Sequence, residues 1–185
     1  MRVSSYSFAT VASGVLLLAT MNATQAQTAC IIGTNPNSCT IASGVTLTGI
    51  VRARNDGVSI DNFGTVNGSI STGGNSSLIA NSGTVVNSIS ITGRNSTIIN
   101  TGVINLELDV DGDNATAVNS GTVNGGIFVF GADSTITNSG TTAVISVAGP
   151  GGGNLVINSG TVIGVIQSSF SSSDSVLINT GKVLD

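Results

Sequence analysis

The densest group of chemically active side chains in this 185-residue chain is the acidic stretch ELDVDGDN at Glu107–Asn114. Its carboxylates alternate with Leu108 and Val110, which predicts an extended segment whose acids share the outer face and enter a turn at Gly112. Clusters rich in oxygen bind hard cations, so the stretch is a candidate Ca²⁺ site. The four candidate ligands are Glu107, Asp109, Asp111 and Asp113.

The match to a calcium-binding loop is incomplete. An EF-hand loop that starts at Asp109 requires glycine and glutamate where the chain has Asn114 and Ser120. The alternative interpretation is a solvated acidic edge that discourages pairing with other chains, and we favour it. Apart from this candidate Ca²⁺, no cofactor is expected.

Catalytic groups are scarce elsewhere. The chain has no histidine, and its basic residues after the amino-terminal segment are Arg52, Arg54, Arg94 and Lys182. A nucleophile or general base needs an orienting partner, so we predict a protein that is not an enzyme, with a carboxylate-dependent polysaccharide enzyme as a minor alternative. The net charge of −4 argues against a nucleic-acid partner, which requires clustered basic residues.

The amino terminus and the cysteines predict export. A positive charge in MRV, a short apolar run at Phe8–Met21 and small residues at Thr24–Ala26 are typical of a secretory signal peptide cleaved after Ala26. In an oxidising compartment Cys30 and Cys39, which flank the turn-forming IIGTNPNS, are expected to form a disulfide. We assign residues 1–26 to the signal peptide, 27–41 to a disulfide-loop cap and 42–185 to repeats.

The repeats explain how these side chains are positioned. The motif NSGTV occurs at Asn81, Asn119 and Asn158, and looser copies fill the intervals, with successive asparagines 19, 19, 19, 19, 20 and 21 residues apart. Such a period is the signature of a stacked repeat fold. The repeated asparagines are Asn62, Asn81, Asn100, Asn119, Asn138, Asn158 and Asn179.

Apolar residues recur at fixed even offsets from each asparagine. They stand two residues before it (Ile60, Ile79, Ile98, Ala117, Ile136, Val156, Leu177) and four after it, and a glycine always stands two after it. The column eight residues after it reads Ile70, Ile89, Leu108, Ile127, Ser146 and Ile166. Even offsets place side chains on one face of extended chain, whereas a helical period fits none of them. We predict an all-β fold, a single right-handed parallel β-solenoid of about seven coils of 19–21 residues.

The asparagines share the parity of the buried aliphatic residues, so we expect them to point inward at a corner and bond one another as a ladder. In the first coil, Ala42 is expected to occupy the asparagine position, with Gly44, Ile50 and Ile60 in register. Thr65, Thr84, Thr122, Thr141 and Thr161 form an outward row that suggests an ice-binding solenoid as a second minor alternative.

A signal peptide, a cysteine pair and ladders of I-x-N-S-G-T-V resemble the passenger domains of Gram-negative autotransporters from about Thr40 to Asp185. The resemblance implies a β-helix displayed at the cell surface, often for adhesion, and associated with the outer membrane. Such passengers are exported through a carboxy-terminal β-barrel, which these 185 residues do not include. We therefore expect either a fragment of a longer autotransporter or a stand-alone relative.

The predicted function is an exported adhesive or structural stalk that contacts glycans or proteins of host or neighbouring cells. The alternative is a self-assembling extracellular fibre subunit. The last copy, NTGKVLD at Asn179–Asp185, covers only part of a coil. We therefore expect self-association through the exposed carboxy-terminal edge of the solenoid.

Overall fold

The computed structural model describes residues 38–149, 152–168 and 174–184. The predicted signal peptide, most of the predicted cap and Cys30 lie outside the described residues. Every regular element in these ranges is a β-strand, and every strand pair is parallel. Within the same ranges, no helix has the length and apolar character needed to cross a bilayer.

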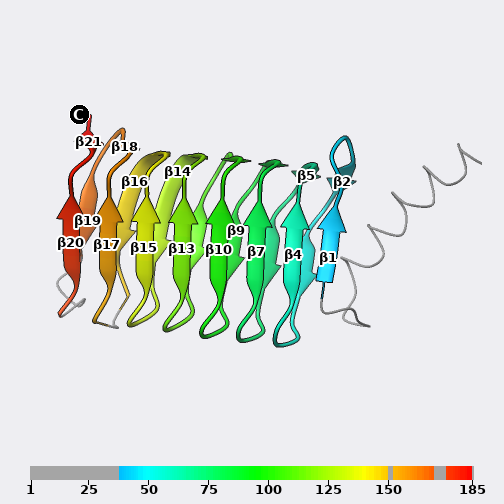
Figure 1. The fold of residues 1–185 in the computed structure, drawn as a ribbon, viewed down its shortest axis with the longest axis horizontal. Helices are drawn as coiled ribbons and strands as arrows, with labels where there is room; N and C mark the ends of the chain where they lie inside the picture. Colours follow the sequence, from blue (N-terminus) through cyan, green and yellow to red (C-terminus); the bar gives the residue numbers. More distant parts are fainter. Residues whose placement is uncertain (1–37, 150–151, 169–173, 185) are drawn as a thin grey trace, which may run out of the picture.

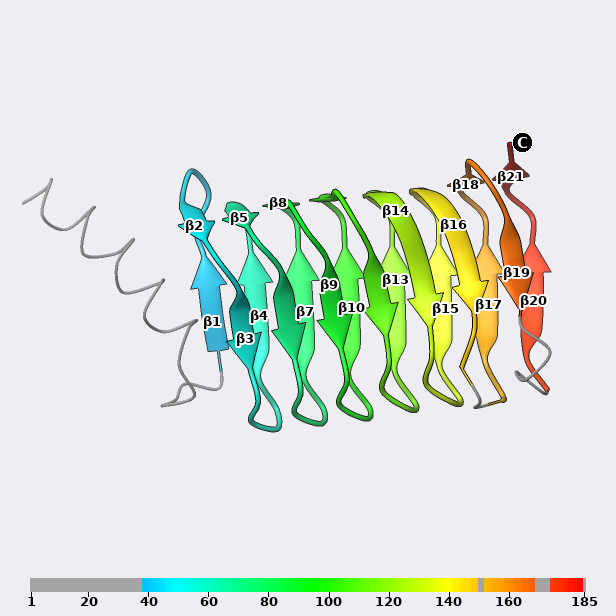
Figure 2. The same cartoon turned by 180° about the vertical axis from the view of Figure 1, so that it is seen from behind.

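The strands stack into two sheets that face each other across the core (Figure 1, Figure 2). The first sheet has eight strands of four residues each, stacked in chain order. They are β1 (Ser38–Ile41), β4 (Ser59–Asn62), β7 (Leu78–Asn81), β10 (Thr97–Asn100), β13 (Thr116–Asn119), β15 (Thr135–Asn138), β17 (Leu155–Asn158) and β20 (Val176–Asn179). Eight stacked strands define seven steps of the coil, and most neighbouring strands are offset by 19 residues.

The second sheet has thirteen strands in two rows. One row lies next to the asparagine corner and contains β2 (Thr46–Thr48), β5 (Thr65–Asn67), β8 (Thr84–Val85), β11 (Val103–Ile104), β18 (Thr161–Val162) and β21 (Lys182–Val183). The other row contains β3 (Val51–Ala53), β6 (Ile70–Thr72), β9 (Ile89–Ile91), β12 (Leu108–Val110) and β19 (Ile166–Ser168). The longer strands β14 (Thr122–Val129) and β16 (Thr141–Val147) run through both rows and join them.

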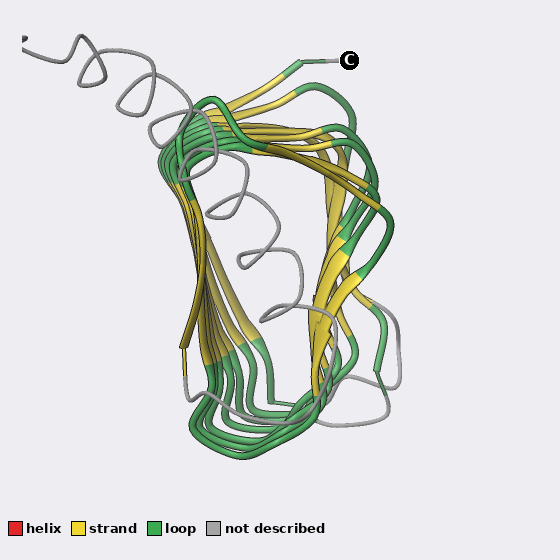
Figure 3. Cartoon of the chain, turned by 90° about the vertical axis from the view of Figure 1, so that its right-hand side faces the viewer, coloured by secondary structure: helices red, strands yellow, loops and turns green. Residues whose placement is uncertain are grey.

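The coil is right-handed. From the amino-terminal end the chain rises through the first sheet, crosses over the corner and descends through the second sheet while it advances toward β20 (Figure 1, Figure 2). Seen along the stack, the coils superimpose with two long sides and narrow corners (Figure 3). The predicted right-handed parallel β-solenoid of about seven coils is confirmed.

Alternating burial along each strand produces the core. In β4, β7, β13, β15 and β17 every second residue is buried, and the inward side chains stack on the equivalent side chains of the next coil. Isoleucine, valine and leucine fill these columns, because β-branched residues suit extended backbone and identical residues pack evenly at the strand spacing of about 4.8 Å. A single coil cannot bury its apolar side, so the stack is the folding unit.

The first coil differs from the prediction. Strand β1 already pairs with β4, so the solenoid begins by Ser38 rather than at residue 42. Ile41, not Ala42, lies opposite Asn62, and Val51 rather than Ile50 lies opposite Ile70. The corner between β1 and β2 is two residues longer than the next one, because it contains a turn in which the Val45 N–H donates to the Ala42 carbonyl over 3.1 Å. Ile50 is consequently 54% exposed.

The assignment of Ser146 to the inner column is also wrong. Ile145 pairs with Ile127 and Ile166, and it is fully buried. The register shifts because β14 has two residues, Asn124 and Gly125, where β16 has only Ala143. The coil is one residue shorter at this corner, and the apparent interruption of the apolar column disappears in three dimensions.

Candidate functional site

The repeated asparagines form a continuous hydrogen-bonded ladder inside the corner after each first-sheet strand. The Nδ2 of each asparagine donates to the Oδ1 of the asparagine in the next coil over 2.7 Å, from Asn62 through to Asn179. The six members from Asn62 to Asn158 are at most 1% exposed, whereas Asn179 in the last coil is exposed. Buried amides of this kind are tolerated because each one is bonded to the next.

The asparagine backbone satisfies the rest of the corner. The Asn62 carbonyl accepts the N–H of Ser82 over 2.8 Å and the N–H of Gly83 over 3.0 Å, and the same pair of bonds recurs in the following coils. A Cβ on Gly83 would collide with the Gly64 carbonyl, so this column must be glycine for the coils to approach. The NSGTV motif therefore forms the corner, and its buried amide and backbone groups hydrogen-bond to the equivalent groups of neighbouring coils.

A second polar ladder, which the sequence analysis missed, supports the opposite turn. Buried serines lie just before the first-sheet strands, and the Ser77 N–H donates to the Ser96 Oγ over 3.1 Å. The Ala115 N–H donates in the same way to the Ser134 Oγ, and the Ser134 N–H donates to the Asn154 Oδ1 over 2.8 Å. The 19-residue spacing of Ser77, Ser96, Ala115 and Ser134 could have predicted this second ladder from the sequence. The alanine at position 115 obscured the repeat of serine.

The predicted calcium ligands are not gathered into a metal site. Glu107, Asp109 and Asp111 follow one another along the outside of β12, whereas Asp113 lies in the next turn and pairs with Arg94 over 3.2 Å. Asp113 Oδ1 also accepts the N–H of Ala132 over 3.0 Å. Among the described residues, no group of three or more His, Cys, Asp or Glu side chains is arranged to hold a metal ion. The extended strand spreads the carboxylates instead of wrapping them around a cation.

Two of these carboxyls have raised pKa values. Burial against the sheet, with smaller contributions from the neighbouring carboxylates of Glu107 and Asp111, raises the pKa of Asp109 from 3.8 to about 6. Burial also raises the pKa of Asp111. Strand β12 thus concentrates negative charge on a partly desolvated surface, where the binding of a cationic group from another molecule would be favourable.

That surface belongs to a longer face with ordered chemistry. The outward side chains of β3, β6, β9, β12 and the second half of β14 form what we call the charged face. Its central row, one residue per coil, reads Arg52, Ser71, Ser90, Asp109 and Phe128 by strand register. The same register predicts a neighbouring row of Arg54, Gly73, Thr92, Asp111 and Phe130.

Two shallow hollows lie on the charged face. The first has a volume of about 230 Å³, and Arg52, Arg54, Ser71 and Thr92 contribute to its lining. The second has a volume of about 270 Å³ and is lined by Glu107, Asp109, Asp111, Phe128 and Phe130. The rings of Phe128 and Phe130 stack with centroids 6.4 Å apart, and Phe130 is 44% exposed. The basic hollow, the small hydroxyl residues and the acidic aromatic hollow therefore follow one another along the rod.

The sequence pattern singled out the acids of this face, whereas Phe128, Phe130 and their alignment with Arg52 and Arg54 were not predicted. The alternation in IFVF at Ile127–Phe130 indicated that both rings face outward. Their position beside Asp109 and Asp111 depends on the pairing of β12 with β14.

The threonine row is present on another face. Thr46, Thr65, Thr84, Val103, Thr122, Thr141, Thr161 and Lys182 are in register across consecutive coils. Thr65, Thr84 and Thr122 are half-buried rather than fully exposed.

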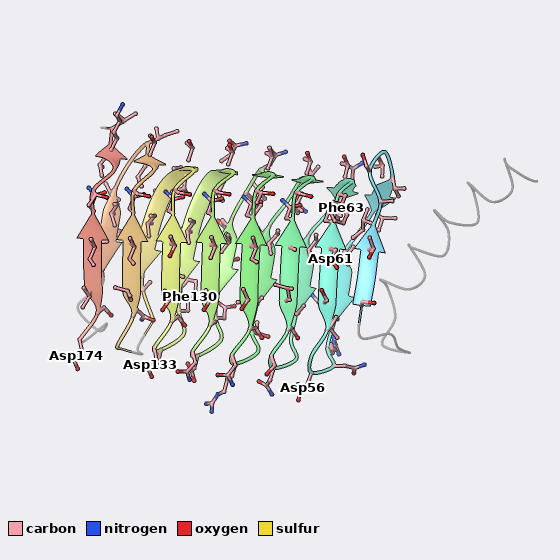
Figure 4. All side chains as sticks on the ribbon, viewed as in Figure 1. Asp56, Asp61, Phe63, Phe130, Asp133 and Asp174 are labelled. Atoms are coloured by element: carbon pink, nitrogen blue, oxygen red, sulfur yellow. The ribbon has the colours of Figure 1, made fainter. Side chains whose placement is uncertain are left out.

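Three further acids lie away from both faces. Figure 4 shows that Asp56, Asp133 and Asp174 lie along the edge formed by the turns that lead into the first sheet.

The predicted cap is described only at its carboxy-terminal end. Cys39 is buried in β1. Cys30 lies outside the described residues, so the pairing of Cys30 with Cys39 stays a prediction.

No protein-family model matches the sequence, and no curated protein or solved structure matches it either. The function is therefore inferred from the surfaces of this chain.

Proposed function

We propose that the chain is an exported, passenger-like surface protein whose solenoid is an adhesive or structural stalk and which does not act as an enzyme. The observation that carries this proposal is the regular outer surface of the rod. Each coil presents the same outward positions at intervals of about 4.8 Å, so weak contacts are repeated along the stack.

The chemistry of these outer positions suits glycan or protein surfaces. The row after the asparagines contains Ser82, Thr101, Ser120, Ser139, Ser159 and Thr180. Several of these hydroxyls donate weakly to the asparagine carbonyl of the preceding coil, as Ser82 Oγ does to Asn62 over 3.3 Å, and they can still accept from solvent or a ligand. Hydroxyls and amides in register offer many alternative hydrogen bonds to a polyhydroxylated surface.

Export is the part of the proposal that rests on the amino terminus. Expression of the full chain in a Gram-negative host should yield a periplasmic or extracellular product that begins near Gln27 and carries a Cys30–Cys39 disulfide. Mass spectrometry of the intact product and of its non-reduced peptides measures both features. A cytoplasmic product that retains Met1 and two free thiols would contradict the proposal.

Adhesion is tested separately with the processed protein. Beads coated with it should be retained on glycan arrays or on cultured cells, and soluble protein should compete for that retention. A processed protein that is retained on none of these surfaces would contradict the adhesive role, and turnover of a polysaccharide substrate would contradict the non-enzymatic one.

A fibre subunit is the second candidate function, and the last described coil favours it. Leu177 and Val183 are each more than 40% exposed there, whereas their partners one coil earlier, Val156 and Val162, are at most 1% exposed. End-to-end addition of another copy would cover them. Light scattering that rises with concentration, together with filaments in electron micrographs, would support this candidate.

A further inference from the structure

The charged face carries opposite charges on coils that are separated by neutral ones. Arg52 and Arg54 lie on the coil of β3, and Asp109 and Asp111 lie on the coil of β12. The two intervening coils present Ser71, Ser90 and Thr92 together with Gly73. These small residues leave the middle of the face open to close approach by another surface.

The two charged groups do not neutralise each other within the chain. Three strand steps separate Arg52 from Asp109, about 14 Å at the spacing of parallel strands. In the part of the chain that the structure describes, no ion pair joins Arg52 or Arg54 to a carboxylate, and Arg52 Nε donates to Ser71 Oγ over 3.2 Å. Both groups therefore remain available to an outside partner.

The pattern is complementary to itself. A two-fold axis parallel to the strands and midway between β6 and β9 turns one rod antiparallel to another with the two charged faces together. This operation places Arg52 over the Asp109 of a second copy, because both residues belong to one row. It also exchanges Ser71 with Ser90, and the neighbouring row brings Arg54 to Asp111 in the same way.

We propose that the charged face is a homotypic interface, occupied by a second copy of this chain in the antiparallel orientation. The hollow lined by Asp109, Asp111, Phe128 and Phe130 receives Arg52 and Arg54 of the second copy. A guanidinium bonds carboxylates through paired N–H groups and also stacks on aromatic rings, so this lining suits arginine in particular. The contact occurs twice, once on each side of the two-fold axis.

The interface is small. Four coils at about 4.8 Å and a strip about 13 Å wide give roughly 250 Å² on each copy, well below the roughly 800 Å² of a standard interface. We therefore expect weak association, with a Kd on the order of 10⁻⁴ M, that weakens further with salt. Copies held close together on one surface would reach such concentrations. The inference is independent of the adhesive role, since pairing in solution requires neither export nor a glycan.

The test uses two charge-reversed variants of the full chain. One variant carries Arg52→Glu and Arg54→Glu, and the other carries Asp109→Arg and Asp111→Arg. All four side chains are on the outer face, and circular dichroism melting verifies that each variant folds. Sedimentation equilibrium from 10 µM to 1 mM protein at low salt measures association (concentrations on the order of the expected Kd).

We expect the unaltered chain to dimerise reversibly, each variant alone to associate at least tenfold more weakly, and an equimolar mixture to recover the dimer. The mixture is decisive because only the mixed pair places opposite charges at both halves of the two-fold contact. A matched control with Asp56→Arg and Asp133→Arg changes the charge equally at exposed turns and should leave dimerisation unaltered.

Three outcomes would overturn the proposal. In the first, the unaltered chain is monomeric at 1 mM (about ten times the expected Kd). In the second, each charge-reversed variant dimerises as well as the unaltered chain, which would assign association to another surface such as the carboxy-terminal edge. The third outcome is a monomer whose acidic hollow binds a tetra-arginine peptide and loses it on Asp109→Asn with Asp111→Asn, which would assign the hollow to a foreign basic segment.

Discussion

Asn119 shows how one side chain can connect three coils. Its Oδ1 accepts from Asn100 and its Nδ2 donates to Asn138, each over 2.7 Å, while the side chain is 1% exposed. Its neighbour Ser120 is exposed. Two adjacent polar residues of the same motif therefore have different energetic roles, because strand parity turns one inward and the other outward.

Replacing Asn119 with valine should lower the free energy of unfolding by about 1–3 kcal/mol, since the amides of Asn100 and Asn138 each lose a buried partner. Ser120→Val should change it by less than about 0.5 kcal/mol, as is usual for surface substitutions. Urea denaturation of both variants measures the difference. Equal effects would contradict the structural role of the ladder.

Asp109 should make stability depend on pH in an unusual direction. Its pKa rises from 3.8 to about 6 on folding, because of burial and then the charges of Glu107 and Asp111. The folded state therefore binds the proton more tightly, and this group's contribution to stability falls as pH rises from about 4 to 6. The adjacent side chains on the other strands, Ser90 and Phe128, are uncharged.

Asp109→Asn should therefore melt at a higher temperature than the unaltered chain at pH 7 and at the same temperature near pH 4. The expected gain is about 1 kcal/mol, less than the full shift implies, because Asp109 is partly exposed and its charge is screened by solvent. Thermal melts between pH 4 and pH 8 measure it. A gain that is constant over this range would contradict the assigned pKa.

At the level of the strands and corners, close backbone approach is the limiting requirement. The corner glycines stack so tightly that a Cβ on Gly121 would collide with the carbonyl oxygen of Gly102. A different glycine, Gly73 at the end of β6, has only the Thr92 Oγ1 near its would-be Cβ, at 3.6 Å. The identity of the residue matters at the first position and hardly at the second.

Gly121→Ala should destabilise the solenoid by at least about 2 kcal/mol, because the coils must separate or the corner must distort. Gly73→Ala should stay within about 1 kcal/mol of the unaltered chain. Equilibrium unfolding of the pair provides the comparison. Similar losses at both positions would show that the corner relaxes easily.

At the scale of the whole molecule, burial changes toward the carboxy-terminal end of the described rod. Ile136, Val156 and Leu177 belong to one inner column, as the pairing of β15, β17 and β20 shows. Ile136 is fully buried, whereas Leu177 is 47% exposed. In a stacked repeat each coil depends on its neighbours, so local stability should decrease in the same direction.

Ile136→Ala should cost about 3 kcal/mol, and Leu177→Ala should cost less than about 1 kcal/mol, because the second leaves little buried cavity. Amide hydrogen exchange should likewise be slowest in β13 and β15 and fastest in β20 and β21. Equal costs for the two substitutions would indicate that the last coil is covered in solution.

The sequence alone determined the architecture of the coil. Three features are visible in it: the period, the parity of the apolar residues, and the recurrence of asparagine and glycine. They follow from the alternation of side chains along each strand and from the stacking of identical residues in successive coils. These features specify an inward asparagine at Asn119 without reference to any distant residue. The same reasoning correctly placed Thr65, Thr84 and Thr122 in one outward row.

The tertiary structure decided the features that depend on corner length. Ile41 rather than Ala42 lies opposite Asn62, and Ile145 rather than Ser146 faces the core, because a corner that is longer or shorter shifts the register of the strand after it. The charged face depends on the same register, which sets Arg52 in line with Asp109, 57 residues away in the sequence. Strand pairing is non-local, so these neighbours become visible only when the coils are stacked.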